Sequence, residues 1–207
     1  MKTISSAIGI VISSVLVLSG CSPSDSSVGD SSTPPRVTAA AAAGWKDEFA
    51  DASRRARTDF ERSALSDGRI TDAEFSEMEN GFAGCLRDHN VTFDGFGVGG
   101  GYGFTPRTGT TTEEANSIAD DCSARSGLDT VGYLYFAMQR NPQNLDEATI
   151  TAACLVKKKV VPPSYSARDY SRDAPTQAFP FSDKTSGDKA LEQCSTDPLG
   201  LLESRER

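Results

Sequence analysis

Five cysteines constrain this chain more than any other feature. They are Cys21, Cys85, Cys122, Cys154 and Cys194. An odd count leaves at least one cysteine outside an intramolecular disulfide framework, and Cys21 stands apart because it directly follows an apolar segment. In an oxidising compartment the other four would form two disulfides, with one of three connectivities. The role of Cys21 therefore decides how the rest of the chain is interpreted.

The first 20 residues have the pattern of an export signal. Lys2 supplies a positive charge, and residues 4–18 form an apolar run that is shorter than the roughly 20 residues of a spanning helix. Leu18-Ser19-Gly20-Cys21 resembles a bacterial lipobox. The resemblance implies that residues 1–20 are removed and that diacylglycerol is attached to Cys21. Two or more acyl chains would then anchor the protein at the extracytoplasmic face of the cell membrane.

Composition indicates a tether behind this anchor. Residues 21–43 begin with the lipidated cysteine and continue with Ser, Asp, Pro, Thr and Ala, which bury too little surface to fold. A flexible chain of this length reaches about 25 Å. Removal of residues 1–20 takes away Lys2 and no acid, so the net charge moves from −8 to −9. This acidity argues against nucleic acid as a partner and against charge-driven membrane binding.

Residues 44–207 have the length of one domain, and an internal resemblance within them favours one disulfide connectivity. Segments 83–86 and 152–155 each place two small residues before Cys-Leu, and segments 117–123 and 189–195 each end in Cys-Ser. The predicted pairs are Cys85 with Cys122 and Cys154 with Cys194. Bridges that cross between the two halves, such as one from Cys85 to Cys154, are the alternative.

Apolar periodicity predicts helices in the first part of this domain. Large and small apolar residues recur every three or four positions over about 45–65, which predicts a first helix. Asp67-Gly68 then predicts a turn. Thr71 with Glu74 has the letters of a capping box, and the helix that follows places Cys85 on its core face.

Further helices are expected after residue 109. Thr110 with Glu113 suggests the next start, and the apolar pattern continues until Asn141-Pro142. Asn144 with Glu147 suggests the cap of the helix that carries Cys154.

The remaining part of the chain is expected to be less regular. Residues 163–186 are predicted to be irregular with one short strand, and residues 188–194 form a last short helix. The predicted fold is all-α, with two divergent helix-loop-helix units that are each closed by a disulfide.

A glycine-rich segment interrupts the first unit. Residues 95–100 match the letters G-x-G-x-x-G. A dinucleotide site requires a strand before the glycines and a helix that begins on them, whereas here a predicted helix precedes them and Tyr102, Phe104 and Pro106 follow. The glycines instead predict a flexible loop or a short hairpin, because they permit positive φ. Four aromatic residues within and beside this segment are the predicted partner contacts. They are Phe93, Phe96, Tyr102 and Phe104.

No motif in the sequence predicts catalysis, a metal or a cofactor. Residues 63–75 share spacing with a calcium-binding loop, but Ser63 and Leu65 replace its first ligands. Ser186 and Lys189 have the letters of penicillin-recognising enzymes, whose motifs lie far apart in the chain and do not overlap as these do. His89 follows Cys85 by one turn, and a cysteine in a disulfide has no thiolate to activate.

The lipobox, the tether, the Asp67–Phe75 corner and Cys85-Leu86-x-x-x-x-Val91 together resemble small lipoproteins of actinobacteria. That resemblance implies location and a disulfide scaffold, and it implies no activity. Two hypotheses follow. The first is a non-enzymatic module that binds an envelope protein or a wall component through the aromatic glycine-rich segment or through residues 160–186. The second is an envelope hydrolase whose carboxylates converge only in the folded chain. An enzyme should have an enclosed pocket with perturbed carboxylates, whereas a binding module should have an exposed apolar patch.

Overall fold

Side-chain caps determine where several helices begin. The computed structural model describes residues 44–202, so the predicted signal segment, Cys21 and the predicted tether lie outside the described residues. Four helices begin at a capping box, in which a hydroxyl accepts a hydrogen bond from the backbone three residues later and an acidic side chain there accepts one in return. The four boxes are Thr58 with Glu61, Thr71 with Glu74, Thr111 with Glu114 and Ser166 with Asp169.

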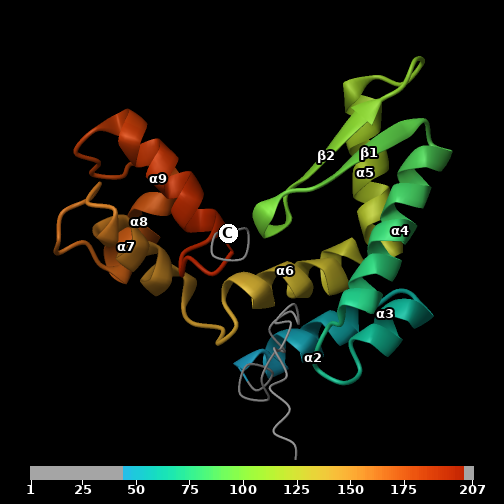
Figure 1. Cartoon of the computed structure of the whole chain (residues 1–207), viewed down its shortest axis with the longest axis horizontal. Helices are drawn as coiled ribbons and strands as arrows, with labels where there is room; N and C mark the ends of the chain where they lie inside the picture. The colour runs from blue at the N-terminus through green and yellow to red at the C-terminus, as the bar shows by residue number, and fades with distance from the viewer. Residues whose placement is uncertain (1–43, 203–207) are drawn as a thin grey trace, which may run out of the picture. The chain divides into compact units, whose positions relative to one another are not determined.

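Within residues 44–202 the chain is mostly helical, with one antiparallel pair of strands (Figure 1). The α-helices are α2 (Lys46–Arg55), α3 (Asp59–Ala64), α4 (Asp72–Asp88), α5 (Thr112–Ser126), α6 (Tyr133–Arg140), α7 (Glu147–Lys157), α8 (Ala167–Asp173) and α9 (Lys184–Thr196). The strands are β1 (Val91–Phe96) and β2 (Tyr102–Pro106), joined through the 3-10 turn η1 (Val98–Gly100), and the π-helix η2 (Leu128–Gly132) leads into α6. The predicted hairpin is present, and the fold is therefore not purely all-α.

The predicted helix over 45–65 is wrong, because two helices occupy this range. The backbone leaves the helical conformation after Arg55, and Thr58 begins α3 in an extended conformation. The carboxylate of Glu61 accepts hydrogen bonds from the N–H groups of Arg57 and Thr58 at 2.8 Å each. These bonds satisfy backbone donors at the break between α2 and α3. The apolar periodicity thus continues across two separate helices.

Two further helix starts differ from the sequence prediction. The capping box of α5 uses Thr111 with Glu114, one residue later than predicted. The cap of α7 is Asp146, which accepts a hydrogen bond from the N–H of Thr149. Asn144 instead has positive φ, and its side-chain amide donates to the carbonyl of Gly44.

The segment predicted to be irregular contains a helix. Ser166 and Asp169 form the capping box of α8, which spans seven residues and is followed by the short 3-10 turn η3 (Ala174–Thr176). The last helix, α9, begins after its cap Asp183 and is longer than the predicted 188–194. The predicted strand in 163–186 is absent from these described residues.

Two hydrophobic clusters form the core, and each contains one disulfide. The first cluster draws on α2 to α6 and β1 and includes Phe82, Leu86 and Leu134, which are fully buried. The second draws on α7, α8 and α9 with their connections. Cys85 of α4 is bonded to Cys122 of α5, and Cys154 of α7 is bonded to Cys194 of α9. This pairing is the one that the internal resemblance predicts.

The segment after α6 joins these two clusters. The guanidinium of Arg140 donates two hydrogen bonds of 2.8 Å to the carboxylate of Glu147 and one of 2.9 Å to the carbonyl of Ser195, at the end of α9. Asn141 is fully buried, and its carbonyl accepts a hydrogen bond of 3.1 Å from the indole of Trp45. The start of α2 and the last turn of α9 are therefore held to the same short segment.

Candidate functional site

A β-bulge places the four predicted contact residues on one face of the hairpin. Phe93 pairs with Phe104 and Phe96 with Tyr102, and the register shifts between Phe93 and Gly95. The bulge adds one residue to β1, so Phe93 and Phe96 have the same orientation although they are three positions apart. Gly95 has φ 105°, a conformation that favours glycine. The sequence prediction thus named four residues that the fold brings together.

Helices α4 and α6 add four more rings to this face. Phe82 lies 5.4 Å from Phe93 and 5.1 Å from Tyr102 between ring centroids. Phe75 stacks on Tyr135 at 4.0 Å and lies 5.6 Å from Phe96. The eight rings form one continuous network, which we call the aromatic face. Its members are Phe75, Phe82, Phe93, Phe96, Tyr102, Phe104, Tyr135 and Phe136.

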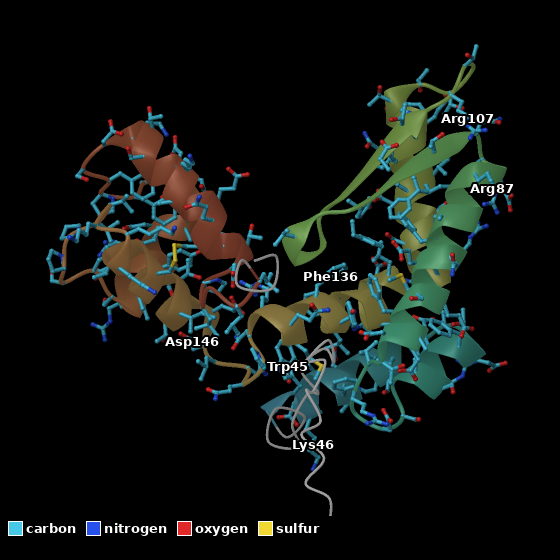
Figure 2. All side chains as sticks on the ribbon, in the orientation of Figure 1. Trp45, Lys46, Arg87, Arg107, Phe136 and Asp146 are labelled. Atoms are coloured by element: carbon cyan, nitrogen blue, oxygen red, sulfur yellow. A yellow bond between two sulfur atoms is a disulfide. The ribbon has the colours of Figure 1, made fainter. Side chains whose placement is uncertain are left out.

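The turn of the hairpin also lies against α6. Phe136 lies between α6 and this turn (Figure 2), with its ring 5.3 Å from that of Phe96. A Cβ atom on Gly100 would lie 2.6 Å from the ring of Phe136, so only glycine permits this approach without a shift. Phe136 is not among the contacts predicted from the sequence. The aromatic run Tyr133-x-Tyr135-Phe136 was the available signal.

The aromatic face is half-open to solvent. Phe82 is fully buried, Tyr102 is exposed, and the other six rings are half-buried. The sequence suggested an exposed aromatic loop, whereas the rings pack edge to face with one another and with α4. Large aromatic side chains usually gain most from complete burial. Open ring surface at seven of eight positions is therefore a feature that a partner could cover.

Two carboxylates lie beside these rings on α4. Asp72 accepts a hydrogen bond of 2.9 Å from the hydroxyl of Tyr135. Glu79 lies four residues after Phe75 and three before Phe82, which places all three side chains on the same side of the helix. Glu79 is half-buried, and within the described residues its carboxylate has neither a hydrogen bond nor an ion pair. The carboxylate is nevertheless open to water, because no buried side-chain oxygen in residues 44–202 lacks a partner.

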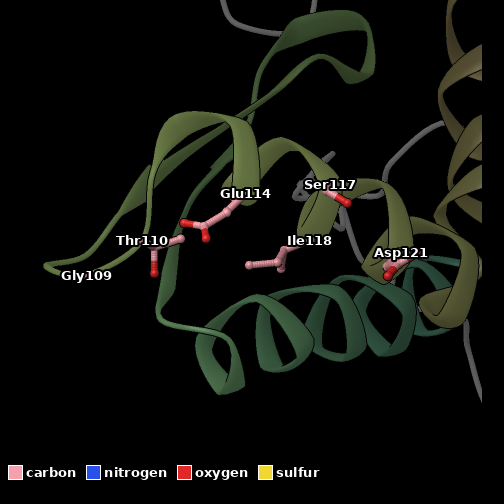
Figure 3. Close-up of a pocket in the computed structure, with 6 residues that line it drawn as sticks. All are labelled: Gly109, Thr110, Glu114, Ser117, Ile118 and Asp121. Atoms are coloured by element: carbon pink, nitrogen blue, oxygen red, sulfur yellow. The ribbon is translucent and has the colours of Figure 1, made fainter.

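A separate depression lies along α5 (Figure 3). It has a volume of about 350 Å³, opens widely to solvent and is lined by residues of α5 and the preceding turn, among them Glu114, Ser117 and Asp121. The N–H and hydroxyl of Thr111 hold the pKa of Glu114 below its ordinary value. A carboxylate engaged in this way cannot accept a substrate proton without losing the cap. Glu114 is thus engaged in the cap of α5, and the depression that it lines is open to solvent.

The other candidates from the sequence occupy structural positions. His89 is the exposed C-cap residue of α4, while Asp67 accepts hydrogen bonds from the N–H and guanidinium of Arg69 in the predicted turn. The four bonded cysteines hold pairs of helices together. Among residues 44–202, no cluster of three or more potential metal ligands occurs.

Two further findings concern membrane spanning and similarity to known proteins. No helix among the described residues combines the length and the apolar character needed to cross a membrane. Comparisons of this chain with protein-family models, curated proteins and solved structures found no match.

Proposed function

We propose that this protein is an extracytoplasmic lipoprotein, anchored to the cell membrane through Cys21, that binds an envelope protein or a wall component without catalysing a reaction. The observation that carries the proposal is the half-open aromatic face, a contiguous set of rings on a disulfide-bonded scaffold. Aromatic side chains contribute large contact areas at low conformational entropy, and they are enriched in the energetically dominant parts of interfaces.

The anchor rests on the lipobox pattern that ends at Cys21. Two disulfides are compatible with an oxidising compartment, which is where an exported domain would fold. Replacement of Cys21 with Ala should move the protein out of the membrane fraction or leave its signal segment uncleaved. Unchanged retention of a processed chain in membranes would contradict the anchor.

In the same proposal, the two disulfide-closed halves are divergent copies of one unit. Each has a helix with a Cys-Leu pair that is bonded to a later helix, over 37 residues in one half and 40 in the other. The intervening segments differ, since the first forms the hairpin and the second contains α8. The first copy would then have gained the aromatic face while the second kept a supporting role.

The positions of the apolar and acidic groups favour binding over the alternative of an envelope hydrolase. The acids of the open depression are exposed, and Glu114 is committed to its cap. The aromatic face, in contrast, has the open apolar surface expected of a contact site.

In-cell crosslinking with mass spectrometry tests the binding function. Wild-type protein should capture a reproducible partner, and Tyr102→Ala should reduce that capture at least threefold. Thr108→Ala is the control, because Thr108 is exposed in the turn at the opposite end of the hairpin. Equal capture by wild type and Tyr102→Ala, or equal loss in both variants, would contradict the proposal.

A further inference from the structure

A carboxylate that has no ion pair in the described part of the chain, Glu79, lies beside the aromatic face. Glu79 lies between Phe75 and Phe82 along one side of α4, is half-buried, and has no ion pair among residues 44–202. Several arginines of α2 and α3 do pair with neighbouring acids, such as Arg54 and Arg55 with Asp51. None of the ion pairs found in the described residues involves Glu79 or Asp72.

The surrounding charge also favours a cation. Residues 44–140, which contain the aromatic face, have 17 acidic and 10 basic side chains, a net charge of −7. Residues 141–202 have 8 acidic and 7 basic side chains, a net charge of −1. The negative charge is thus concentrated in the half that carries the rings, where it would attract a cationic partner and repel an anionic one.

Aromatic rings beside a carboxylate form a chemical environment suited to ammonium and guanidinium groups. The face of each ring has negative electrostatic potential, and a lysine or arginine placed within about 6 Å of the ring centroid is attracted to it. Phe75, Tyr135, Phe96 and Phe136 provide adjoining rings, since Phe75 lies 5.6 Å from Phe96 and 5.2 Å from Phe136 between centroids. A neutral sugar could stack on the rings and donate hydroxyl hydrogen bonds to Glu79, but only a cation would also neutralise the charge of this carboxylate.

We propose that the aromatic face binds a basic segment of a partner protein, with lysine or arginine side chains against the rings and beside Glu79. This inference rests on the proposed binding function and specifies the chemistry of its partner. It assigns Glu79 and Asp72 to the contact together with Phe75, Phe96 and Tyr102.

Equilibrium binding to the full chain in a neutral detergent tests the inference. The probes are a twelve-residue peptide of alternating lysine and alanine, its counterpart with glutamate in place of lysine, and chitohexaose as a neutral sugar. Glu79→Gln should weaken binding of the lysine peptide about three- to tenfold, and Tyr102→Leu should weaken it similarly. Glu77→Gln is the matched control, because it makes the same charge change at an exposed position of the same helix and should alter binding less than about twofold.

Each result supports or overturns the inference. Preference for the lysine peptide together with loss in Glu79→Gln but not in Glu77→Gln supports it. Equal effects of the two glutamate variants would show attraction by net charge alone and overturn it, as would absence of binding to the lysine peptide. Chitohexaose binding that requires Tyr102 but not Glu79 would also overturn it. In-cell capture that depends on Tyr102, without preference for a basic peptide, would leave the proposed function intact and remove only this inference.

Discussion

The hydroxyl of Thr130 donates a hydrogen bond of 2.8 Å to Oε1 of Glu61, a residue 69 positions earlier whose exposed fraction is 2 %. Oε2 of the same carboxylate accepts from the hydroxyl of Thr58 and from the N–H groups of Arg57 and Thr58. A single buried side chain therefore joins the break between α2 and α3 to the π-helix η2. Because η2 leads into α6, this contact supports the helix that carries Tyr135 and Phe136.

Replacement of Glu61 with Ala should lower the free energy of unfolding by about 3 kcal/mol, because one buried donor and three part-buried donors lose an acceptor. Chemical denaturation measures the change. Glu77→Ala on the exposed side of α4 is the control and should change stability by less than about 0.5 kcal/mol. A loss below about 1 kcal/mol in Glu61→Ala would show that water or other side chains replace the carboxylate.

The titration of Glu61 should lower the free energy of unfolding at acidic pH. Burial raises the pKa of Glu61, but hydrogen bonds from Thr130, Thr58 and Arg57 outweigh it and hold the pKa below its ordinary value of 4.5. The folded state thus binds this proton more weakly than the unfolded state does. The stabilisation is fully present above about pH 4.5 and disappears as the pH falls through the lower, folded-state pKa.

Denaturation midpoints measured between pH 3 and pH 7 should therefore decline below about pH 4.5 in the wild type. The decline should be shallower in Glu61→Gln, which cannot titrate at this position. Parallel curves for the two proteins would assign the acid sensitivity to other carboxylates, such as Asp173 beside Arg172.

The caps show how far the sequence predicts the helices. Thr71 with Glu74 was identified because a turn precedes it and a clear apolar pattern follows. Thr58 with Glu61 has the same capping-box pattern, but it lies within a continuous apolar repeat. Apolar periodicity alone does not show that a cap divides the repeat into two helices. At residues 110–114 three threonines precede two glutamates, so the letters allow two adjacent registers. The structure adopts the later register.

The aromatic face was predictable in part. The hairpin residues are recognisable as a glycine-rich aromatic segment, but Phe93 and Phe96 are three apart, a spacing that a regular strand places on opposite faces. A bulge at Gly95 brings them to one face, and its position depends on backbone geometry rather than on a motif. The sequence does not single out Glu79, because single acidic residues are common on helices. Only its neighbours in the folded chain distinguish it.

Gly95 and Gly101 provide a matched test of the bulge. A Cβ atom would meet nothing within 4 Å at either position, but Gly95 has φ 105° whereas Gly101 has φ −64°. Gly95→Ala should therefore destabilise the protein by about 1 kcal/mol through backbone strain alone. Gly101→Ala should be neutral or slightly stabilising. Equal melting temperatures for the two variants would show that the bulge does not require glycine.

The two disulfides should stabilise different parts of the chain. Cys122 is buried in the first hydrophobic cluster and Cys194 in the second. Closing loops of 37 and 40 residues contributes roughly 4 kcal/mol each in the chain-entropy model. Replacement of Cys154 and Cys194 with Ser should accelerate hydrogen exchange in α7 and α9 much more than in α4 and α5. Replacement of Cys85 and Cys122 should do the reverse, and uniform acceleration in both variants would indicate one cooperative unit.

Site-resolved photo-crosslinking in cells tests the central claim, contact through the aromatic face, most directly. A photoreactive amino acid is placed at Tyr102, whose side chain is exposed on this face, or at Glu113, which is exposed on α5. The account predicts that the chain with the label at position 102 forms one discrete adduct and that the chain labelled at position 113 forms none of it. The same adduct from both positions, or an adduct from position 113 alone, would contradict the claim.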